Sequence, residues 1–154
     1  MNATGNIVGS DTSQSDALVI FGISGDLAAK KIFPALYAMV KRGVLKVPVL
    51  GVASSAWTLE QLRLHVRESL QKEGGIDDKA ACGRLLALLR YVSGDYNDAA
   101  TFDAIKTTLD GARRPAHYLA IPPALFATVV KGIGAAGLAR QARVIVEKPF
   151  GRDL

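Results

Sequence analysis

The feature that most constrains the fold of this chain is a regular alternation of short apolar runs with longer segments of helical periodicity. The first run, residues 17–22 (ALVIFG), is rich in β-branched and aromatic residues and ends on glycine. A run that is apolar at every position predicts a strand buried on both faces, as in a parallel sheet. Consecutive parallel strands need a long crossover between them, and the segments that follow such runs here are long enough for helices.

The alternation continues along the whole chain. We expect further strands at residues 47–53, 91–92, 117–121 and 143–147. We expect helices at residues 27–40, 58–70, 76–89, 98–109 and 123–136. Within these helices, Thr58 with Gln61 is a possible capping box, Asp98 can cap a helix, and Pro34 should kink or break the first one. This order predicts an α/β fold with a doubly wound, Rossmann-like parallel sheet.

Length and composition suit one compact domain. The chain has 154 residues, of which 49% are hydrophobic and 21% charged. We expect a flexible polar tail at residues 1–16 and a single folded domain at 17–154. The chain has neither a signal-peptide pattern nor an apolar run of the roughly 20 residues that span a membrane, which favours a soluble intracellular protein.

Cysteine, histidine and charge content narrow the classes of function. Cys82 is the only cysteine, which excludes an internal disulfide. His65 and His117 are far apart in sequence and suggest structural histidines rather than a metal site. The net charge of +5 is spread over separated basic pairs without interleaved aromatic residues. We therefore expect an anionic ligand site and do not expect nucleic-acid binding.

A glycine-containing loop, residues 22–28 (GISGDLA), lies between the first expected strand and the first helix. Gly22 suits a tight turn, Gly25 lets the backbone approach a ligand, and Ala28 permits close helix packing. The amides at the start of the helix would favour a diphosphate, with Asp26 as a helix cap. This spacing is looser than the full dinucleotide-binding pattern, so an ordinary strand-to-helix turn stays open as an alternative.

The end of the second expected strand faces the ribose of any dinucleotide bound there. It carries Ser54 and Ser55, with neither the acid that selects NAD nor the arginine that selects NADP. The choice of cofactor is therefore open from the residues alone. Trp57 could cover an adenine ring, and packing in the core is the alternative.

The end of the fifth expected strand places Lys148 at the same edge of the sheet, where its ammonium group can meet a phosphate or a substrate hydroxyl. Pro149 restricts Lys148 to an extended backbone. The alternative is a solvated ion pair between Glu147 and Lys148.

Three segments, taken together and in this order, resemble the glucose-6-phosphate dehydrogenase family. They are FGISGDLAAKKIFPALY from Phe21, YLAIPP from Tyr118 and RVIVEKPFGRDL from Arg143. The resemblance implies the dinucleotide-binding domain of a larger two-domain enzyme, whose catalytic and dimerisation domain is absent from this chain. Such an enzyme oxidises glucose 6-phosphate to 6-phosphogluconolactone with NADP, or NAD, in the cytoplasmic pentose phosphate pathway, as a homodimer or homotetramer.

The same resemblance implies a set of site residues at matching positions. The cofactor-binding positions are Gly22, Ile23, Ser24, Gly25, Asp26, Leu27, Ala28, Ala29, Lys31, Ser54, Tyr96, Ala120, Pro122 and Lys148. Lys148 matches a lysine shared with the substrate, and Pro149 matches a proline that is cis in the family. Ser54 stands where the family usually has an arginine for the 2′-phosphate, which leaves NAD or dual use open.

No catalytic residue is expected in this chain. The family's catalytic histidine lies in a segment resembling RIDHYLGKE that these 154 residues do not contain. A general base contributes about 10²- to 10⁴-fold to such a reaction, so we expect the chain to bind cofactor without turnover. The alternative reading is a non-catalytic nucleotide-binding or assembly module, which would have little use for a lysine at position 148.

Overall fold

The computed structural model describes residues 15–139 and 143–146, in which five parallel strands form one sheet of order β3-β2-β1-β4-β5. The strands are β1 (Ala17–Phe21), β2 (Val49–Ala53), β3 (Leu89–Ser93), β4 (Pro115–Leu119) and β5 (Arg143–Val146). The chain builds outward from β1 to β3 and then crosses to the other side of β1 for β4 and β5. This is the strand order of a doubly wound dinucleotide-binding sheet, so the predicted fold class is confirmed.

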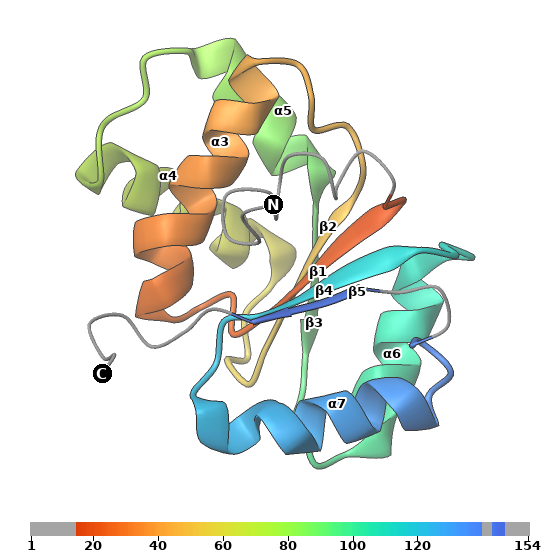
Figure 1. The fold of residues 1–154 in the computed structure, drawn as a ribbon. Coiled ribbons are helices and arrows are strands. Elements are labelled where there is room, and N and C mark those ends of the chain that lie inside the picture. Colours follow the sequence, from red (N-terminus) through yellow and green to blue (C-terminus); the bar gives the residue numbers. More distant parts are fainter. Residues whose placement is uncertain (1–14, 140–142, 147–154) are drawn as a thin grey trace.

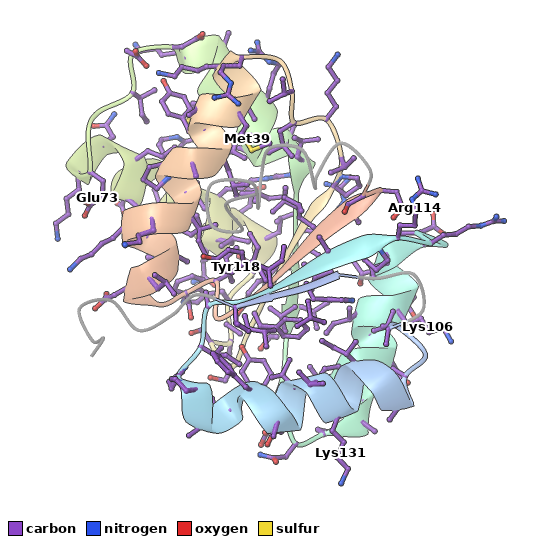
Figure 2. All side chains as sticks on the ribbon, in the orientation of Figure 1. Met39, Glu73, Lys106, Arg114, Tyr118 and Lys131 are labelled. Atoms are coloured by element: carbon purple, nitrogen blue, oxygen red, sulfur yellow. The ribbon has the colours of Figure 1, made fainter. Side chains whose placement is uncertain are left out.

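Helices cover both faces of this sheet (Figure 1). One layer holds η1 (Ala28–Ile32), α3 (Phe33–Lys41), α4 (Leu59–Lys72) and α5 (Lys79–Leu88). The opposite layer holds α6 (Ala99–Leu109) and α7 (Phe126–Ala135), the latter preceded by the short η2 (Pro123–Leu125). Figure 2 shows side chains filling the space between the sheet and each layer, with Lys131 of α7 pointing outward.

The central strand explains the continuous apolar run. All five residues of β1 are buried, because successive side chains point to opposite faces and a helical layer covers each face. Leu18 and Ile20 join the core cluster under α3, α4 and α5. Val19 and Phe21 join the separate cluster under α6 and α7.

Several predicted boundaries move by one to three residues; the second strand, for example, begins at Val49 and not at residue 47. The fourth strand is Pro115–Leu119 and not residues 117–121, with Pro115 at its first position, where the missing amide is tolerated. The helix expected from residue 76 begins at Lys79, because the Asp78 side chain accepts a hydrogen bond from the Ala81 amide and caps it there. Leu89 belongs to β3 rather than to that helix.

The break predicted at Pro34 takes the form of a π turn. η1 ends where the Phe33 amide donates to the carbonyl of Ala28, five residues back, and α3 starts at Phe33 with Pro34 in its first turn. Proline has no backbone N–H to donate. The wider π turn accommodates this missing hydrogen bond, and the helix continues.

Helix caps follow the sequence in two of three cases. The Thr58 and Gln61 capping box is present, with the Gln61 amide 3.1 Å from Thr58 Oγ1 and the Thr58 amide 2.8 Å from Gln61 Oε1. The Asp98 carboxylate accepts from the Ala100 amide at 3.0 Å. Asp26 does not take the predicted cap position, because it is already helical and the Gly25 carbonyl before it accepts a hydrogen bond from the Ala29 amide at 3.2 Å.

The predicted tail falls largely outside the described residues, which begin at Ser15. Asp16 is bonded to the domain, since its carboxylate accepts from the amides of Arg113 at 2.6 Å and Arg114 at 2.8 Å. In the part of the chain that the structure describes, none of the helices has the length and apolar character to cross a membrane.

Candidate functional site

Gly22 closes β1 at the point where the strand order reverses, between β1 and β4. Its φ of +85° lies in the left-handed region, and a Cβ there would lie 2.2 Å from the Ala120 carbonyl oxygen. The Gly22 amide donates to the Val52 carbonyl at 2.7 Å, and the Ala120 amide donates to the Phe21 carbonyl at 2.9 Å. The tight turn predicted at Gly22 is confirmed, and it joins the carboxyl ends of β1, β2 and β4.

The loop after Gly22 is anchored in the core by some of its residues and exposed to solvent at others. Ile23 is fully buried, and its side chain fills the space that a Cβ at Gly51 would occupy. The Gly25 amide donates to the Gly22 carbonyl at 3.0 Å, which closes the turn. Ala28 is fully buried, as close helix packing requires, whereas Gly25 and Asp26 are exposed. The loop therefore presents backbone at the start of a helix to solvent, where its first amides lack intrahelical acceptors.

The loop after β2 lies against this glycine loop. Ser55 Oγ is 3.1 Å from Ser24 Oγ, so side chains that are 31 positions apart meet at the carboxyl edge of the sheet. Ser54 is exposed beside them. These serines supply neutral hydroxyls, which can hydrogen-bond a ribose but do not provide the positive charge that favours a 2′-phosphate.

Two tyrosines reach the end of β2. Tyr96, which the family resemblance singled out, lies 5.9 Å from the Phe21 ring, edge to face, and its hydroxyl is 3.3 Å from the Val52 carbonyl. Burial raises the pKa of Tyr96 to about 12, so its hydroxyl stays protonated and can donate. Tyr91 of β3 donates to the Ser55 carbonyl at 2.5 Å. Sequence analysis missed Tyr91, because its contact depends on the pairing of β2 with β3.

Trp57 is partly buried and packs against the core cluster under α3, α4 and α5. Its ring centroid lies 4.9 Å from that of His65 and 6.3 Å from that of Tyr91. His65 also meets the Phe33 ring edge to face at 5.7 Å, and burial lowers its pKa. These contacts support core packing for Trp57 over the stacking role, and a structural role for His65.

His117, in contrast, lies fully inside the core. It is fully buried in β4, with its ring 6.0 Å from the Phe21 ring. Its Nε2 is 3.1 Å from the Leu138 carbonyl, to which it must donate. Burial lowers the pKa of His117, which keeps the ring neutral. The contacts support the structural role expected for it.

The remaining predicted site residues divide into three groups. Ser24, Leu27 and Ala29 are partly exposed around the loop, and Lys31 is exposed on η1. Ala120 is buried at the end of β4, and Pro122 is exposed just beyond it. Glu147, Lys148 and Pro149 lie outside the described residues, so their roles stay predictions.

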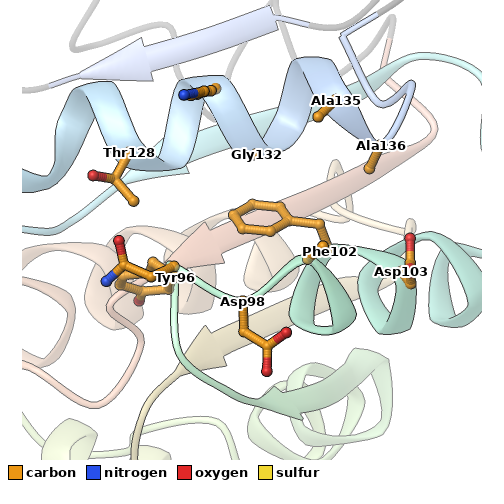
Figure 3. Close-up of a pocket in the computed structure, with 11 residues that line it drawn as sticks. Tyr96, Asp98, Phe102, Asp103, Thr128, Gly132, Ala135 and Ala136 are labelled. Carbon is orange, nitrogen blue, oxygen red and sulfur yellow. The ribbon is translucent and has the colours of Figure 1, made fainter.

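A groove of about 390 Å³ lies between α6 and α7, on one flank of the sheet (Figure 3). Phe102 forms its floor against Gly132, where a Cβ would lie 2.4 Å from the ring. Asp98 and Asp103 line the groove beside Lys131. With two carboxylates and one ammonium group, the lining has an excess of negative charge, which disfavours binding of a diphosphate. The glycine loop is therefore the better dinucleotide site.

Comparison with known proteins agrees with this geometry. The family profile described as "Glucose-6-phosphate dehydrogenase, NAD binding domain" matches residues 19–154. Glucose-6-phosphate 1-dehydrogenase 1 of Mycobacterium tuberculosis (strain ATCC 25618 / H37Rv) is 46% identical over 140 residues, which cover 91% of this chain and 30% of the relative.

Two solved structures have the same fold. The crystal structure of glucose-6-phosphate 1-dehydrogenase from Mycobacterium avium aligns with a TM-score of 0.83 at 46% identity, covering 89% of this chain and 30% of that one. A glucose-6-phosphate dehydrogenase in complex with its substrate glucose-6-phosphate aligns with a TM-score of 0.77 at 32% identity, covering 89% and 31%. The chain therefore spans about 30% of the length of the relatives it matches.

Proposed function

Since this chain belongs to the glucose-6-phosphate dehydrogenase family, through its NAD binding domain, we propose that it holds NADP, or NAD, across the carboxyl edge of its sheet. The observation that carries the proposal is the Gly22 turn, which admits no side chain and lies where the strand order reverses. Ligands of doubly wound sheets bind in the crevice at this position.

The residues present fit such a cofactor. The backbone of the partly exposed Ser24 and of the exposed Asp26 would receive the diphosphate beside Gly25, because helix-start amides favour anions. The hydroxyls of Ser54 and Ser55 would bind the adenosine ribose. Ala120 and the residues after it would lie beside the nicotinamide. When bound, the nicotinamide supplies a hydride acceptor for a sugar substrate.

We extend the proposal to the reaction named for the relatives. The parent activity would be oxidation of glucose 6-phosphate to 6-phosphogluconolactone in the cytoplasm, by a homodimer or homotetramer, with Lys148 contacting both substrate and cofactor. Proton removal from the sugar hydroxyl needs a general base, and no segment resembling the family's histidine motif occurs in these 154 residues. We therefore expect the 154-residue chain to bind cofactor and to form no NADPH or NADH from glucose 6-phosphate.

Isothermal titration of this chain with NADP and with NAD tests the proposal. Inorganic tripolyphosphate is the control, because a chain with net charge +5 attracts polyanions without a built site. Saturable dinucleotide binding, tighter than that of tripolyphosphate and little weakened by salt, is the expected result. Equal binding of tripolyphosphate, or no binding of either dinucleotide, would refute the cofactor assignment.

A further inference from the structure

Two tyrosine hydroxyls hold the carboxyl end of β2 from opposite faces of the sheet, and we infer that one of them, Tyr91, is a positioning residue for the adenosine end of the dinucleotide site. Tyr91 packs against the core under α3, α4 and α5, whereas Tyr96 packs against the core under α6 and α7. The inference rests on the proposed function, because it assigns a role within that site.

The Tyr91 contact fixes the backbone of the loop that carries the serines. Its hydroxyl is 2.5 Å from the Ser55 carbonyl and 3.5 Å from the Ala53 carbonyl. The Trp57 amide also donates to the Ser55 carbonyl, at 2.8 Å. With two donors on one carbonyl oxygen, the peptide plane after Ser55 has a defined orientation, and so do the serine side chains beside it.

The fixed loop is connected to the glycine loop by two routes. Ser55 Oγ is hydrogen-bonded to Ser24 Oγ at 3.1 Å. On the other face, the Val52 carbonyl accepts from the Gly22 amide at 2.7 Å and from the Tyr96 hydroxyl at 3.3 Å. A shift of Ser55 would therefore reach Ser24, where we place the diphosphate, while Tyr96 and Gly22 continue to hold the strand itself.

The Tyr91 hydroxyl is hydrogen-bonded to the loop after β2, whereas the Tyr91 ring packs against the core. The ring is half-buried in β3, where Tyr91 is paired in register with Gly51 of β2. A phenylalanine would keep this packing and remove the bond to the Ser55 carbonyl, together with the contacts of the hydroxyl to the Ala53 carbonyl and the Ser93 side chain. Without that bond the loop is less ordered, and ligand binding must then supply the ordering.

The test compares Tyr91→Phe with the unsubstituted chain in titrations with NADP and with 2′,5′-ADP, which carries only the adenosine end. One hydrogen bond is worth about three- to tenfold in an equilibrium, so we expect both dissociation constants to rise by about that factor. We also expect 2′,5′-ADP to change the emission of Trp57, the only tryptophan, which lies beside Tyr91.

Tyr37→Phe is the matched control. Its hydroxyl donates to Asp77 at 2.7 Å and accepts from the Asp78 amide at 2.8 Å, tying α3 to the segment before α5. Loss of this hydroxyl should lower stability and leave both dissociation constants unchanged.

The outcomes separate the two proposals. If the unsubstituted chain binds neither ligand, the proposed function fails, and the positioning role fails with it. If the unsubstituted chain binds both and Tyr91→Phe binds them equally well, only the positioning role is overturned. The positioning role is also overturned if Tyr91→Phe weakens the binding of NADP but not that of 2′,5′-ADP. It is overturned as well if Tyr91→Phe fails to fold, since the hydroxyl would then serve the fold rather than the loop.

Discussion

Replacing Gly22 with alanine puts a single methyl group at the junction of three strands. The new Cβ would lie 2.2 Å from the Ala120 carbonyl oxygen and 2.9 Å from both the Ala120 carbonyl carbon and Ile121 Cγ2. Ala120 is itself held, because its amide donates to the Phe21 carbonyl at 2.9 Å. The clash therefore cannot be relieved by a side-chain rotation and must separate the ends of β1 and β4.

Two costs add at this position. An alanine at φ +85° is in the left-handed region, which costs about 1–2 kcal/mol for a residue with a Cβ. Forcing backbone apart in a packed region costs about 1–3 kcal/mol more. We expect Gly22→Ala to lower the free energy of unfolding by about 2–5 kcal/mol, a large share of the roughly 5–15 kcal/mol of a typical domain.

Urea unfolding, followed by circular dichroism and by Trp57 fluorescence, measures this change. The matched control is Gly83→Ala in α5, where a Cβ meets nothing within 4 Å and φ is not left-handed. That variant should be more stable by about 0.5–1 kcal/mol, because alanine is the better helix former. Gly22→Ala should also lose NADP binding under conditions where it stays folded.

The reasoning would be refuted by a Gly22→Ala chain that loses less than about 1 kcal/mol of unfolding free energy and binds NADP normally. That result would mean that β1 and β4 separate at little cost. The close approach at Gly22 would then not define the site.

Three further predictions follow from other parts of the chain. Ser54→Arg should improve the preference for NADP over NAD by about tenfold in paired titrations, because a guanidinium group binds a 2′-phosphate; an unchanged ratio would show that the phosphate is elsewhere. Burial lowers the pKa of His117 below 6.5, so the unfolded chain takes up the proton first as the pH falls. Stability is therefore full above about pH 6.5 and falls below it, and His117→Gln should reduce the difference between urea midpoints at about pH 7.5 and 5.5; an identical difference would contradict this assignment. Thr58→Ala should cost about 1 kcal/mol in urea unfolding through loss of the α4 capping box, and no loss would mean that water replaces the cap.

The fold could be predicted from sequence because its main signal is local. Buried parallel strands are apolar at every position, as in β1, and their crossovers carry helical periodicity and caps such as Thr58. Boundaries were less predictable where one side chain decides them. Asp78 caps α5, so this helix starts at Lys79 and not at residue 76. The form of the break at Pro34 depends on which carbonyl accepts a hydrogen bond from the Phe33 amide.

The candidate site could be predicted only in part, for a related reason. The turn at Gly22 is a local feature, and the sequence indicates it directly. The approach of Gly22 to Ala120, and the bond from Tyr91 to the Ser55 carbonyl, join residues 98 and 36 positions apart. Such contacts follow from the strand order and register, which no local pattern specifies.

The account's central claim is that a dinucleotide lies over the glycine loop at the carboxyl edge of the sheet, and amide chemical shifts during an NADP titration test it most directly. The account predicts that the largest shifts occur at Ser24, Gly25 and Asp26, with further shifts at Ser54 and Ser55. It also predicts small shifts in the groove between α6 and α7. Shifts confined to that groove, or spread evenly over the surface lysines and arginines, would contradict the account.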